Sequence, residues 1–314
     1  MGIKRVIFLG TPRFAVPTLE RIVAAGYEVP LVVTQPDRPK GRGNALAPPA
    51  VKETALRLGL EVFQPERIRR PEAQARLAGL KPDAMVVVGY GQIIPQSVID
   101  IPPHGIINVH ASLLPKYRGA APIQWAIVNG ETRTGVTTMG IDAGLDTGDM
   151  LLKAETEIGP EESAVELSVR LAGMGADLLI ETLRGLAGGT IAPQKQDAGQ
   201  ATYAPILKKE DGRIDWRRTA AEIHHRVRGL LPWPGAYTNF RGQVLHVWRS
   251  RVAPGDAAPP GRLISGRKLI VACGAGTALE LLEVQLEGRK KMSGEAFANG
   301  QRLTENDVVG ELDS

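Results

Sequence analysis

Short, β-branched apolar runs alternate with helical patterns through the first half of the chain, and this alternation restricts the fold more than any other feature. Residues 4–10 and 27–35 are strand-like runs that flank residues 14–26, whose apolar side chains recur at helical spacing up to Gly26. Similar apolar runs follow at residues 84–91, 105–112 and 134–142. The early runs are apolar almost throughout, as parallel strands covered on both faces are. The first half is therefore predicted to be α/β, with a Rossmann-like, doubly wound and mostly parallel sheet.

The second half has a different pattern. A long helical segment closes the first half at Gly188 and Gly189, and the next residues are poor in large apolar side chains and rich in Gln, Ala, Pro and Lys. Beyond them, short β-rich runs separated by Gly, Asn and Pro turns are typical of a small β-barrel, for which the oligonucleotide-binding (OB) type is one candidate. The predicted organisation is a Rossmann-like domain, 1–189, a linker, 190–208, and a C-terminal OB-like domain, 209–314.

Composition and charge restrict the class of protein. Cys273 is the single cysteine of the 314 residues, so an intrachain disulfide is excluded, a thiolate metal cluster is disfavoured and a reducing compartment is expected. No apolar run approaches the roughly 20 residues that a membrane helix needs, and the N-terminal segment lacks the pattern of a signal peptide. We therefore expect a cytoplasmic protein with no membrane partner. The formal net charge of +4 permits an anionic partner such as RNA.

Asn108 and His110 stand two residues apart on an apolar strand that is otherwise fit for burial. Residues i and i+2 of a strand point to the same side, so the two polar side chains converge. A single histidine in a strand is more often a satisfied core residue. Here the pair lies where a strand ends, just before a Ser-Leu-Leu-Pro loop, and ligands of open α/β sheets bind at the carboxyl ends of strands. The pair is therefore interpreted as a functional site.

A glycine-rich loop at residues 140–149 offers three carboxylates, Asp142, Asp146 and Asp149. On pattern alone, any of them could be a solvated turn former. A carboxylate within reach of His110 would fix the orientation of the imidazole ring. The pattern alone does not decide which aspartate does so.

Two further segments bear on the function. Gly10 follows the first strand without the second and third glycines of the dinucleotide-binding fingerprint, so a nicotinamide or flavin dehydrogenase is disfavoured. Residues 34–52 form a turn-rich segment that carries Arg38, Lys40 and Arg42. This segment is either a solvated loop or a loop that binds an anion or RNA.

Taken together, six colinear segments resemble the family of 10-formyltetrahydrofolate-dependent formyltransferases, and in particular its members that act on methionine esterified to initiator tRNA. The resemblance covers nearly the whole chain, and the combination of Asn-x-His, Ser-Leu-Leu-Pro and Asp-x-Gly-x-Asp-x-Gly-Asp is highly specific. The segments are residues 8–22, 32–43, 83–95, 108–127, 134–151 and 214–237.

The resemblance implies a role for each of several residues. Matching positions place the family's catalytic Asn, His and Asp on Asn108, His110 and Asp146. Contacts to folate are expected from Ser112, Leu113, Leu114 and Pro115 and from Val88, Gly89, Tyr90 and Gly91. The resemblance also implies that the C-terminal barrel engages tRNA. Binding of tRNA is expected from Arg38, Lys40, Arg42, Lys208 and Lys209.

The implied reaction moves a formyl group from 10-formyltetrahydrofolate to the α-amine of methionyl initiator tRNA. An attacking amine creates a tetrahedral oxyanion, for which the Asn108 amide and a ring N–H of His110 are suitable donors. The reaction requires no metal, and a monomer is the default expectation. Two enzymatic alternatives share the three residues, a nucleotide-amino-sugar formyltransferase and a formyltetrahydrofolate hydrolase. A third alternative is an RNA-binding protein in which the Rossmann-like domain is only a platform.

Overall fold

The computed structural model describes residues 2–40, 45–255, 257–264, 268–304 and 307–310. Contacts between residues divide the chain into two compact units. The first unit consists of Met1–Gly119, Arg133–Thr156 and Ser168–Ala204, and the second of Ala120–Thr132, Glu157–Leu167 and Pro205–Ser314. The chain therefore passes from one unit to the other more than once, a division that differs from the three consecutive segments expected from the sequence.

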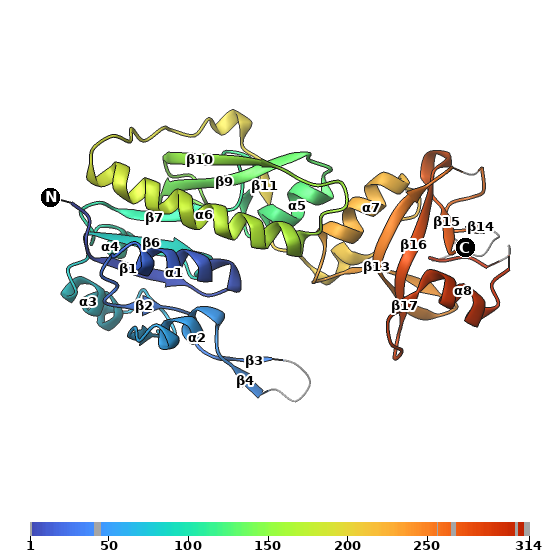
Figure 1. Cartoon of the computed structure of the whole chain (residues 1–314), viewed down its shortest axis with the longest axis horizontal. Helices are drawn as coiled ribbons and strands as arrows, with labels where there is room; N and C mark the ends of the chain where they lie inside the picture. Colours follow the sequence, from blue (N-terminus) through green and yellow to red (C-terminus); the bar gives the residue numbers. More distant parts are fainter. Residues whose placement is uncertain (1, 41–44, 256, 265–267, 305–306, 311–314) are drawn as a thin grey trace. The chain divides into compact units, whose positions relative to one another are not determined.

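The first unit is built on a seven-stranded sheet with the strand order β10-β9-β7-β6-β1-β2-β5 (Figure 1). The five strands from β7 to β5 run parallel to one another, and β9 is antiparallel to β7. The Rossmann-like, mostly parallel sheet expected from the sequence is thus confirmed. The strands are β1 (Val6–Gly10), β2 (Val32–Val33), β5 (Val62–Phe63), β6 (Ala84–Val88), β7 (Ile106–His110), β9 (Arg133–Gly140) and β10 (Met150–Glu157).

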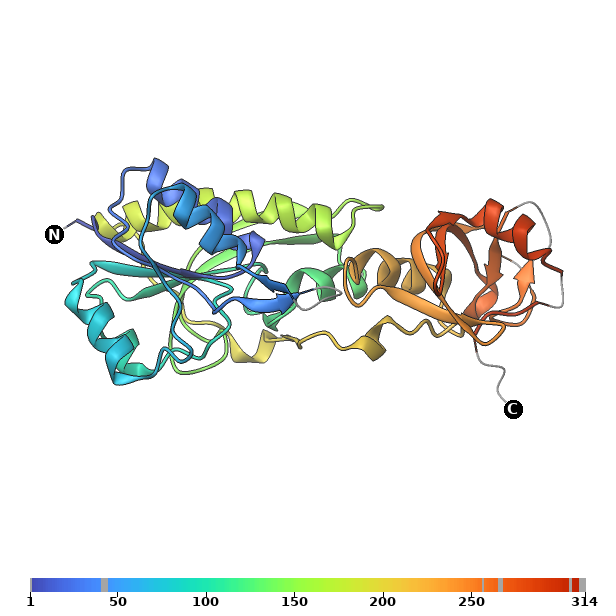
Figure 2. The same ribbon diagram turned by 90° about the horizontal axis from the view of Figure 1, so that it is seen from below.

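Helices cover both faces of this sheet, and Figure 2 shows α1 and α6 on one face with α3 on the other. This arrangement explains the continuous apolar runs, because Ile7 and Phe8 of β1 point to opposite faces and both are fully buried. Ile7 shares a core cluster with Leu77 of α3 and Val98 of α4. The helices are α1 (Val16–Ala24), α2 (Ala50–Arg57), α3 (Pro71–Gly79), α4 (Gln96–Ile99) and α6 (Ala164–Ala187).

The order of the strands reverses between β1 and β6, the position at which open α/β sheets bind ligands. The two strands approach closely at their carboxyl ends, since a Cβ atom on Gly10 would lie 3.1 Å from the carbonyl oxygen of Val88. Thr11 Oγ1 donates a hydrogen bond to the carbonyl oxygen of Tyr90 at 2.9 Å. The carboxyl ends of β1 and β6 are therefore tied together beside β7.

Part of the segment predicted as a linker hydrogen-bonds to the first unit. Strand β11 (Tyr203–Ala204) pairs in parallel with β8 (Arg118–Gly119). Thr202 Oγ1 accepts the backbone N–H of Tyr117 at 2.9 Å, and Gln194 exchanges two backbone hydrogen bonds of 2.8 Å with Met150. Contacts assign the first part of the segment, up to Ala204, to the first unit.

The second unit contains a curled antiparallel sheet in the order β12-β13-β16-β15-β14, with β17 paired to β16 (Figure 1). Phe240, Val247, Leu279 and Phe297 belong to its core, and α7 and α8 pack on the strands. This sheet is consistent with the expected OB-type barrel. The elements are α7 (Ala220–Gly229), β12 (Ala236–Phe240), β13 (Gln243–Ala253), β14 (Leu263–Ile264), β15 (Ile270–Ala272), β16 (Ala278–Leu286), β17 (Met292–Ser293) and α8 (Gly294–Gln301).

The remaining elements are short. Helix α5 (Pro122–Val128) follows β8 in the chain but packs against α7 in the second unit. Strands β3 (Arg38–Lys40) and β4 (Ala45–Ala47) form an antiparallel hairpin after β2. Within the described ranges, none of the helices combines the length and apolar character that crossing a membrane requires.

Candidate active site

Strand β7 carries the two polar side chains that the sequence analysis singled out. Asn108 and His110 are 9% and 6% exposed and alternate with the buried Ile107 and Val109. Their direction follows from the period of two along a strand. His110 is the last residue of β7, so the pair lies toward the carboxyl end of the strand. A buried pair of this kind needs polar partners.

The loop between β9 and β10 supplies one partner for both side chains. Oδ1 of Asp146 lies 3.5 Å from Nδ2 of Asn108, and Oδ2 lies 3.7 Å from Nδ1 of His110. Asp142 instead accepts hydrogen bonds from the backbone of Gly144 and from Thr147 Oγ1 within its own loop. Asp146 is therefore the candidate aspartate whose carboxylate contacts both members of the pair.

His110 faces an acceptor oxygen on each side of its ring. Nε2 lies 2.9 Å from the carbonyl oxygen of Tyr117, so this nitrogen carries a proton and donates it to the carbonyl. Nδ1 faces the Asp146 carboxylate. The two contacts fix the orientation of the ring, the role that the sequence analysis expected for a neighbouring aspartate.

The segment Tyr117 to Gly119 holds both members of the His110–Asp146 pair. The carbonyl of Tyr117 binds His110, and the backbone N–H of Gly119 donates a hydrogen bond to Oδ2 of Asp146 at 2.8 Å. Gly119 has φ +117°, and a Cβ atom there would lie 2.7 Å from the carbonyl oxygen of Ala204. Only glycine accommodates this approach to β11 without strain.

Gln196 is a supporting residue that the sequence analysis missed. Its Nε2 donates to the carbonyl oxygens of Asp146 and Gly148, each at 2.8 Å. Its Oε1 accepts hydrogen bonds from Nε and one terminal nitrogen of Arg118, at 3.0 and 2.8 Å. Arg118 is only 5% exposed and precedes Gly119, so the Gln196–Arg118 contact joins the Asp146 loop to β8. No motif in the sequence signals this contact.

The Ser-Leu-Leu-Pro loop follows β7 and is stabilised by hydrogen bonds from two buried side chains, Ser112 and Thr137. Ser112 Oγ donates to the carbonyl oxygen of Lys116 at 2.6 Å, and Thr137 Oγ1 donates to the carbonyl oxygen of Ser112 at 2.7 Å. Thr137 Oγ1 also accepts the backbone N–H of Leu114 at 3.2 Å. Ser112 and Leu114 are fully buried, so these two side chains shape the loop instead of forming its surface. Leu113 and Pro115 are partly exposed.

The expected folate-binding segment after β6 combines buried side chains with exposed backbone. Val88 and Tyr90 are buried, whereas Gly89 and Gly91 are exposed and have φ +57° and +85°. Burial raises the pKa of the Tyr90 hydroxyl, which therefore remains a neutral phenol. Within the described residues this hydroxyl is buried with no hydrogen-bond partner.

Two exposed apolar side chains lie in the loops that carry the candidate residues. Ile93 lies two residues after Gly91 and is 91% exposed, and Leu145 immediately precedes Asp146 and is 62% exposed. Singly exposed apolar side chains are common on protein surfaces, and these two are relevant only because they lie in the loops that carry the candidate residues. Neither side chain is among the site residues predicted from the sequence.

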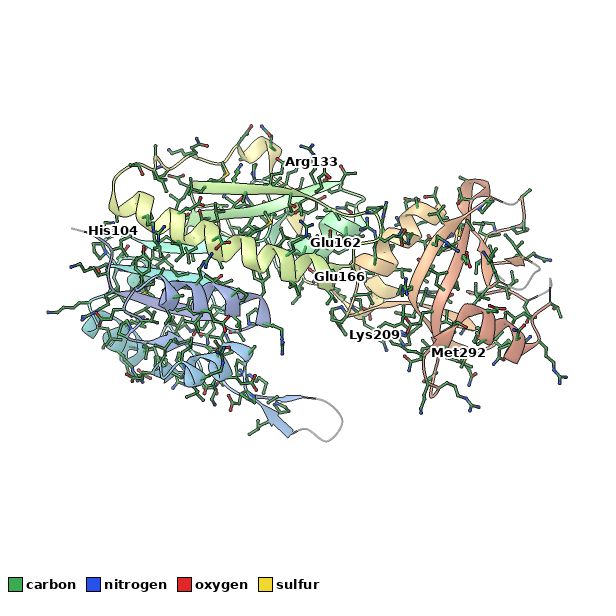
Figure 3. All side chains as sticks on the ribbon, viewed as in Figure 1. His104, Arg133, Glu162, Glu166, Lys209 and Met292 are labelled. Carbon is green, nitrogen blue, oxygen red and sulfur yellow. The ribbon has the colours of Figure 1, made fainter. Side chains whose placement is uncertain are left out.

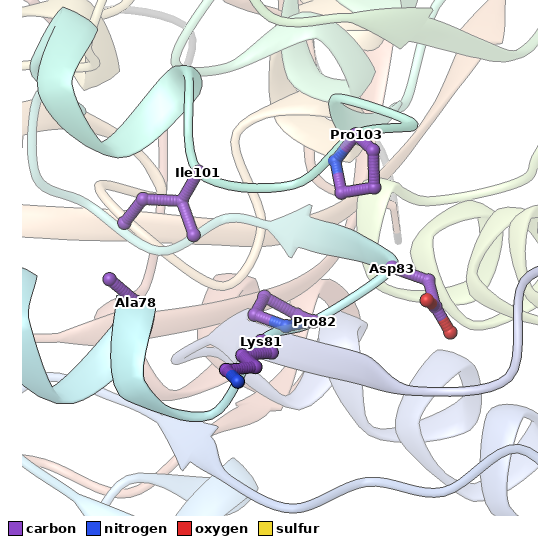
Figure 4. Close-up of a pocket in the computed structure, with 6 residues that line it drawn as sticks. All are labelled: Ala78, Lys81, Pro82, Asp83, Ile101 and Pro103. Atoms are coloured by element: carbon purple, nitrogen blue, oxygen red, sulfur yellow. The ribbon is translucent and has the colours of Figure 1, made fainter.

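The pocket drawn in Figure 4 is not part of the candidate active site. This pocket has a volume of about 320 Å³ and includes Asp83, which immediately precedes β6, and Pro103, which precedes β7. It therefore lies at the amino ends of these strands, away from His110. Its other lining residues are Ala78, Lys81, Pro82 and Ile101. Among the described residues, no cluster of three or more His, Cys, Asp or Glu side chains could hold a metal ion.

The residues expected to bind tRNA lie in both units. Arg38 is exposed on β3, with its guanidinium 3.8 Å from the Glu66 carboxylate. Lys208 and Lys209 are exposed near the beginning of Pro205–Ser314, the last of the three segments of the second unit. Arg42 and the side chain of Lys40 lie outside the part of the chain that the structure describes.

Comparisons with known proteins cover almost the entire chain. Residues 4–183 match the formyl transferase family, and residues 206–302 match the formyl transferase C-terminal domain. The methionyl-tRNA formyltransferase of Solibacter usitatus is 68% identical over 98% of this chain and 99% of its own length. The methionyl-tRNA formyltransferase of Koribacter versatilis is 58% identical over 98% of this chain and 99% of its own length.

Solved structures with the same fold have much lower sequence identity. One is the N-formyltransferase from Helicobacter canadensis in complex with folinic acid and dTDP-3-aminofucose, with a TM-score of 0.66, 18% identity and coverage of 89% of this chain and 98% of that one. Another is HypX from Aquifex aeolicus in complex with tetrahydrofolic acid, with a TM-score of 0.63 and 16% identity. The match covers 95% of this chain and 47% of that one. These structures establish the fold, whereas the sequence relatives establish the family: the chain belongs to the formyl transferase family and, within it, to the methionyl-tRNA formyltransferases.

Proposed function

We propose that this chain transfers the formyl group of 10-formyltetrahydrofolate to the α-amino group of methionine esterified to initiator tRNA, which gives N-formylmethionyl-tRNA for translation initiation. The observation that carries the proposal is the convergence of Asn108, His110 and Asp146 beside the end of β7. The names of the relatives support the choice of acceptor.

Asn108 and His110 act on the oxyanion that forms when the amine attacks the formyl carbon. The Asn108 amide has two N–H groups, of which the one facing Asp146 is held only loosely, at 3.5 Å. The Asn108 amide can therefore still donate a hydrogen bond to the negative charge that develops on the formyl oxygen. The Tyr117 carbonyl already accepts the Nε2 proton of His110. Nδ1 lies 3.7 Å from the Asp146 carboxylate, beyond hydrogen-bond distance, so a protonated Nδ1 is the second donor to the oxyanion. The residues thereby favour the tetrahedral intermediate over the planar reactants.

Asp146 accepts the proton that the attacking amine loses, directly or through a water molecule. Its carboxylate contacts Asn108 and His110 and accepts a hydrogen bond from the backbone N–H of Gly119, which fixes its position. Collapse of the intermediate breaks the bond between the formyl carbon and the folate nitrogen, and that nitrogen takes up a proton. No bond between enzyme and formyl group is required.

Folate is the proposed formyl donor, and the loops around the site suit it. Gly89 and Gly91 expose their backbone groups for hydrogen bonds to a polar ring edge. Ile93 and Leu145 offer apolar surface for a flat ring system. We assign the folate contacts to these loops, with direct contact from Leu113, Pro115, Gly89 and Gly91, which are at least partly exposed. The buried residues of the same segments support these contacts from below the surface, namely Ser112, Leu114, Val88 and Tyr90.

Initiator tRNA is the proposed acceptor substrate, and exposed cations are assigned to it. Phosphate contacts supply affinity independent of sequence and weaken as salt is added. The assigned residues are Arg38, Lys40, Arg42, Lys208 and Lys209. The proposal includes a monomeric enzyme that acts in the cytoplasm, where translation takes place.

The test is an acceptor panel with 10-formyltetrahydrofolate as donor. Methionine-charged initiator tRNA, free methionine, an amino-sugar nucleotide and water are compared, and product is measured for each. Transfer to the charged tRNA alone is the expected result. Transfer to the amino sugar or to water would favour one of the alternative reactions and overturn the assignment of the acceptor.

A further inference from the structure

The outer face of the antiparallel sheet in the second unit carries a row of aromatic side chains. The strand register places Tyr237 of β12 opposite His246 of β13, and His246 opposite Gln285 of β16. Their neighbours along the strands, such as Leu245 and Val284, are buried in the core. Because side chains alternate along a strand, the row points away from that core.

Trp248 extends this row along β13. Its ring is stacked on His246, with a centroid separation of 5.8 Å and an interplanar angle of 27°. His246 in turn contacts Tyr237, with a centroid separation of 6.1 Å. Trp248 Nε1 donates a hydrogen bond to Gln285 Oε1 at 3.1 Å. The indole is therefore held in one orientation, and we call Tyr237, His246 and Trp248 the aromatic row.

Cations border the aromatic row. Nζ of Lys291 lies 3.7 Å from the centroid of the Trp248 ring and 3.9 Å from the Glu283 carboxylate. The turn from Glu287 to Lys291 contains one carboxylate and three cationic side chains. Lys209 also interacts electrostatically with His246, and it is labelled in Figure 3 together with Met292, the neighbour of Lys291.

The row is suited to stacking instead of ion pairing. Burial lowers the pKa of His246, so its ring is neutral at neutral pH despite the nearby Glu287, which opposes the shift. A neutral imidazole beside an indole and a phenol presents flat surfaces without a charge of their own. Flat aromatic surfaces with cations beside them match a nucleobase and its phosphates. An acidic peptide would use the cations but not the stacked rings.

We propose that the aromatic row is a stacking site for an unpaired nucleobase of bound RNA, with Lys291 and Lys209 neutralising the adjacent phosphates. This inference rests on the proposed function, because it makes the RNA of the acceptor substrate the ligand. Lys291 covers one face of Trp248 in the free protein. An incoming base takes this position, and the ammonium group moves to a phosphate.

The test compares two RNA probes, a single strand of ten nucleotides without self-complementarity and a blunt duplex of the same length. The dissociation constant of the full chain for each probe is measured by fluorescence anisotropy. Trp248→Leu is expected to weaken binding of the single strand by about 5-fold to 150-fold and to leave duplex binding unchanged. Trp248→Phe retains a π face and is expected to recover most of the affinity.

Salt titrations distinguish the contribution of base stacking to RNA affinity from the contribution of phosphate neutralisation. Lys291→Gln is expected to reduce the slope of log Kd against log salt by about one, whereas Trp248→Leu leaves the slope unchanged. Lys268→Gln is the matched control, because Lys268 is exposed in the same unit and pairs with Glu280. The control slope is expected to equal that of the unmodified chain.

The outcomes are distinguishable from failure of the proposed function, because binding of these probes involves no formyl transfer. Equal effects of Trp248→Leu on the two probes, or no effect on either, would overturn the stacking site. Circular dichroism checks that each variant is folded. If Trp248→Leu does not fold, Tyr237→Leu in the same row replaces it with the same expected preference for the single strand.

Discussion

The backbone N–H of Gly119 donates a hydrogen bond of 2.8 Å to Oδ2 of Asp146. Tyr117, two residues earlier, accepts a hydrogen bond from Nε2 of His110. One short segment therefore sets the position of both the carboxylate and the imidazole. Because β8 is itself paired with β11, the geometry of the proposed site depends on residues 85 positions further along the chain.

Asp146→Asn is expected to reduce turnover by about 100-fold or more while the fold is retained. The amide keeps the size of the carboxylate but loses its charge and most of its capacity to accept the amine proton. Steady-state kcat with charged initiator tRNA is the measurement, and a thermal melt is the control for folding. Wild-type kcat in a folded Asp146→Asn variant would refute the proposed role.

Gln196→Ala is expected to lower kcat by about 10-fold to 100-fold, because the Asp146 loop loses two backbone contacts. Gln196→Glu is also expected to be impaired, since glutamate still accepts from Arg118 but cannot donate to the loop carbonyls. KM for charged tRNA is expected to change less than kcat.

Gln200→Ala is the matched control for this position. Gln200 lies four residues later, is exposed and donates to Asp197 within its own turn. The kcat of the Gln200→Ala variant is expected to equal that of the unmodified chain. Equal kcat values for Gln196→Ala and Gln200→Ala would contradict a positioning role for Gln196.

Two glycines of α6 are expected to respond to alanine in opposite directions. A Cβ atom on Gly175 would lie 2.7 Å from Cγ1 of Val109, the residue between Asn108 and His110. Gly175→Ala is therefore expected to destabilise the first unit by about 1–3 kcal/mol through overpacking.

Gly173 has open space around it, and Gly173→Ala is expected to stabilise the helix by about 0.5–1 kcal/mol. Urea unfolding of the two variants measures the difference between them. Equal midpoints would show that α6 does not pack on β7 as described.

Cys273 is expected to be inert in the native protein. Its side chain is buried, and burial raises the pKa of the thiol to about 12. At pH 8 this leaves on the order of one thiolate per 10⁴ molecules, and the thiolate is the reactive form. Labelling by a thiol-specific chromogenic reagent is therefore expected to be slow in buffer and fast in denaturant. Rapid labelling of the folded chain would contradict the burial of this residue.

Local patterns were sufficient to predict the layers of the fold and one face of the site. Continuous apolar runs such as that around Phe8 indicated parallel strands, and the period of two placed Asn108 and His110 on one side. The choice of Asp146 over Asp142 did not follow from pattern. It depends on the path of a loop that returns to β7, in which Asp146 adopts a positive φ of 52°.

Long-range contacts made through the backbone could not be predicted. Gln196 lies in a segment whose composition resembles a linker, yet its side chain binds carbonyl groups about 50 residues away. Any residue has a carbonyl group, so the sequence of the partner gives no signal. Helix α5 is a similar case, because its apolar residues predict burial but do not specify that they pack against α7.

The most direct test of the proposed site is the single-turnover rate constant for formyl transfer to methionine-charged initiator tRNA, with enzyme and 10-formyltetrahydrofolate in excess. Binding is saturated under these conditions, so the rate constant reports the chemical step. Asn108→Ala and His110→Ala are each expected to lower it by about 100-fold to 1000-fold, the effect of removing one oxyanion donor. A rate constant equal to that of the unmodified chain in a folded His110→Ala variant would show that the chemistry takes place elsewhere.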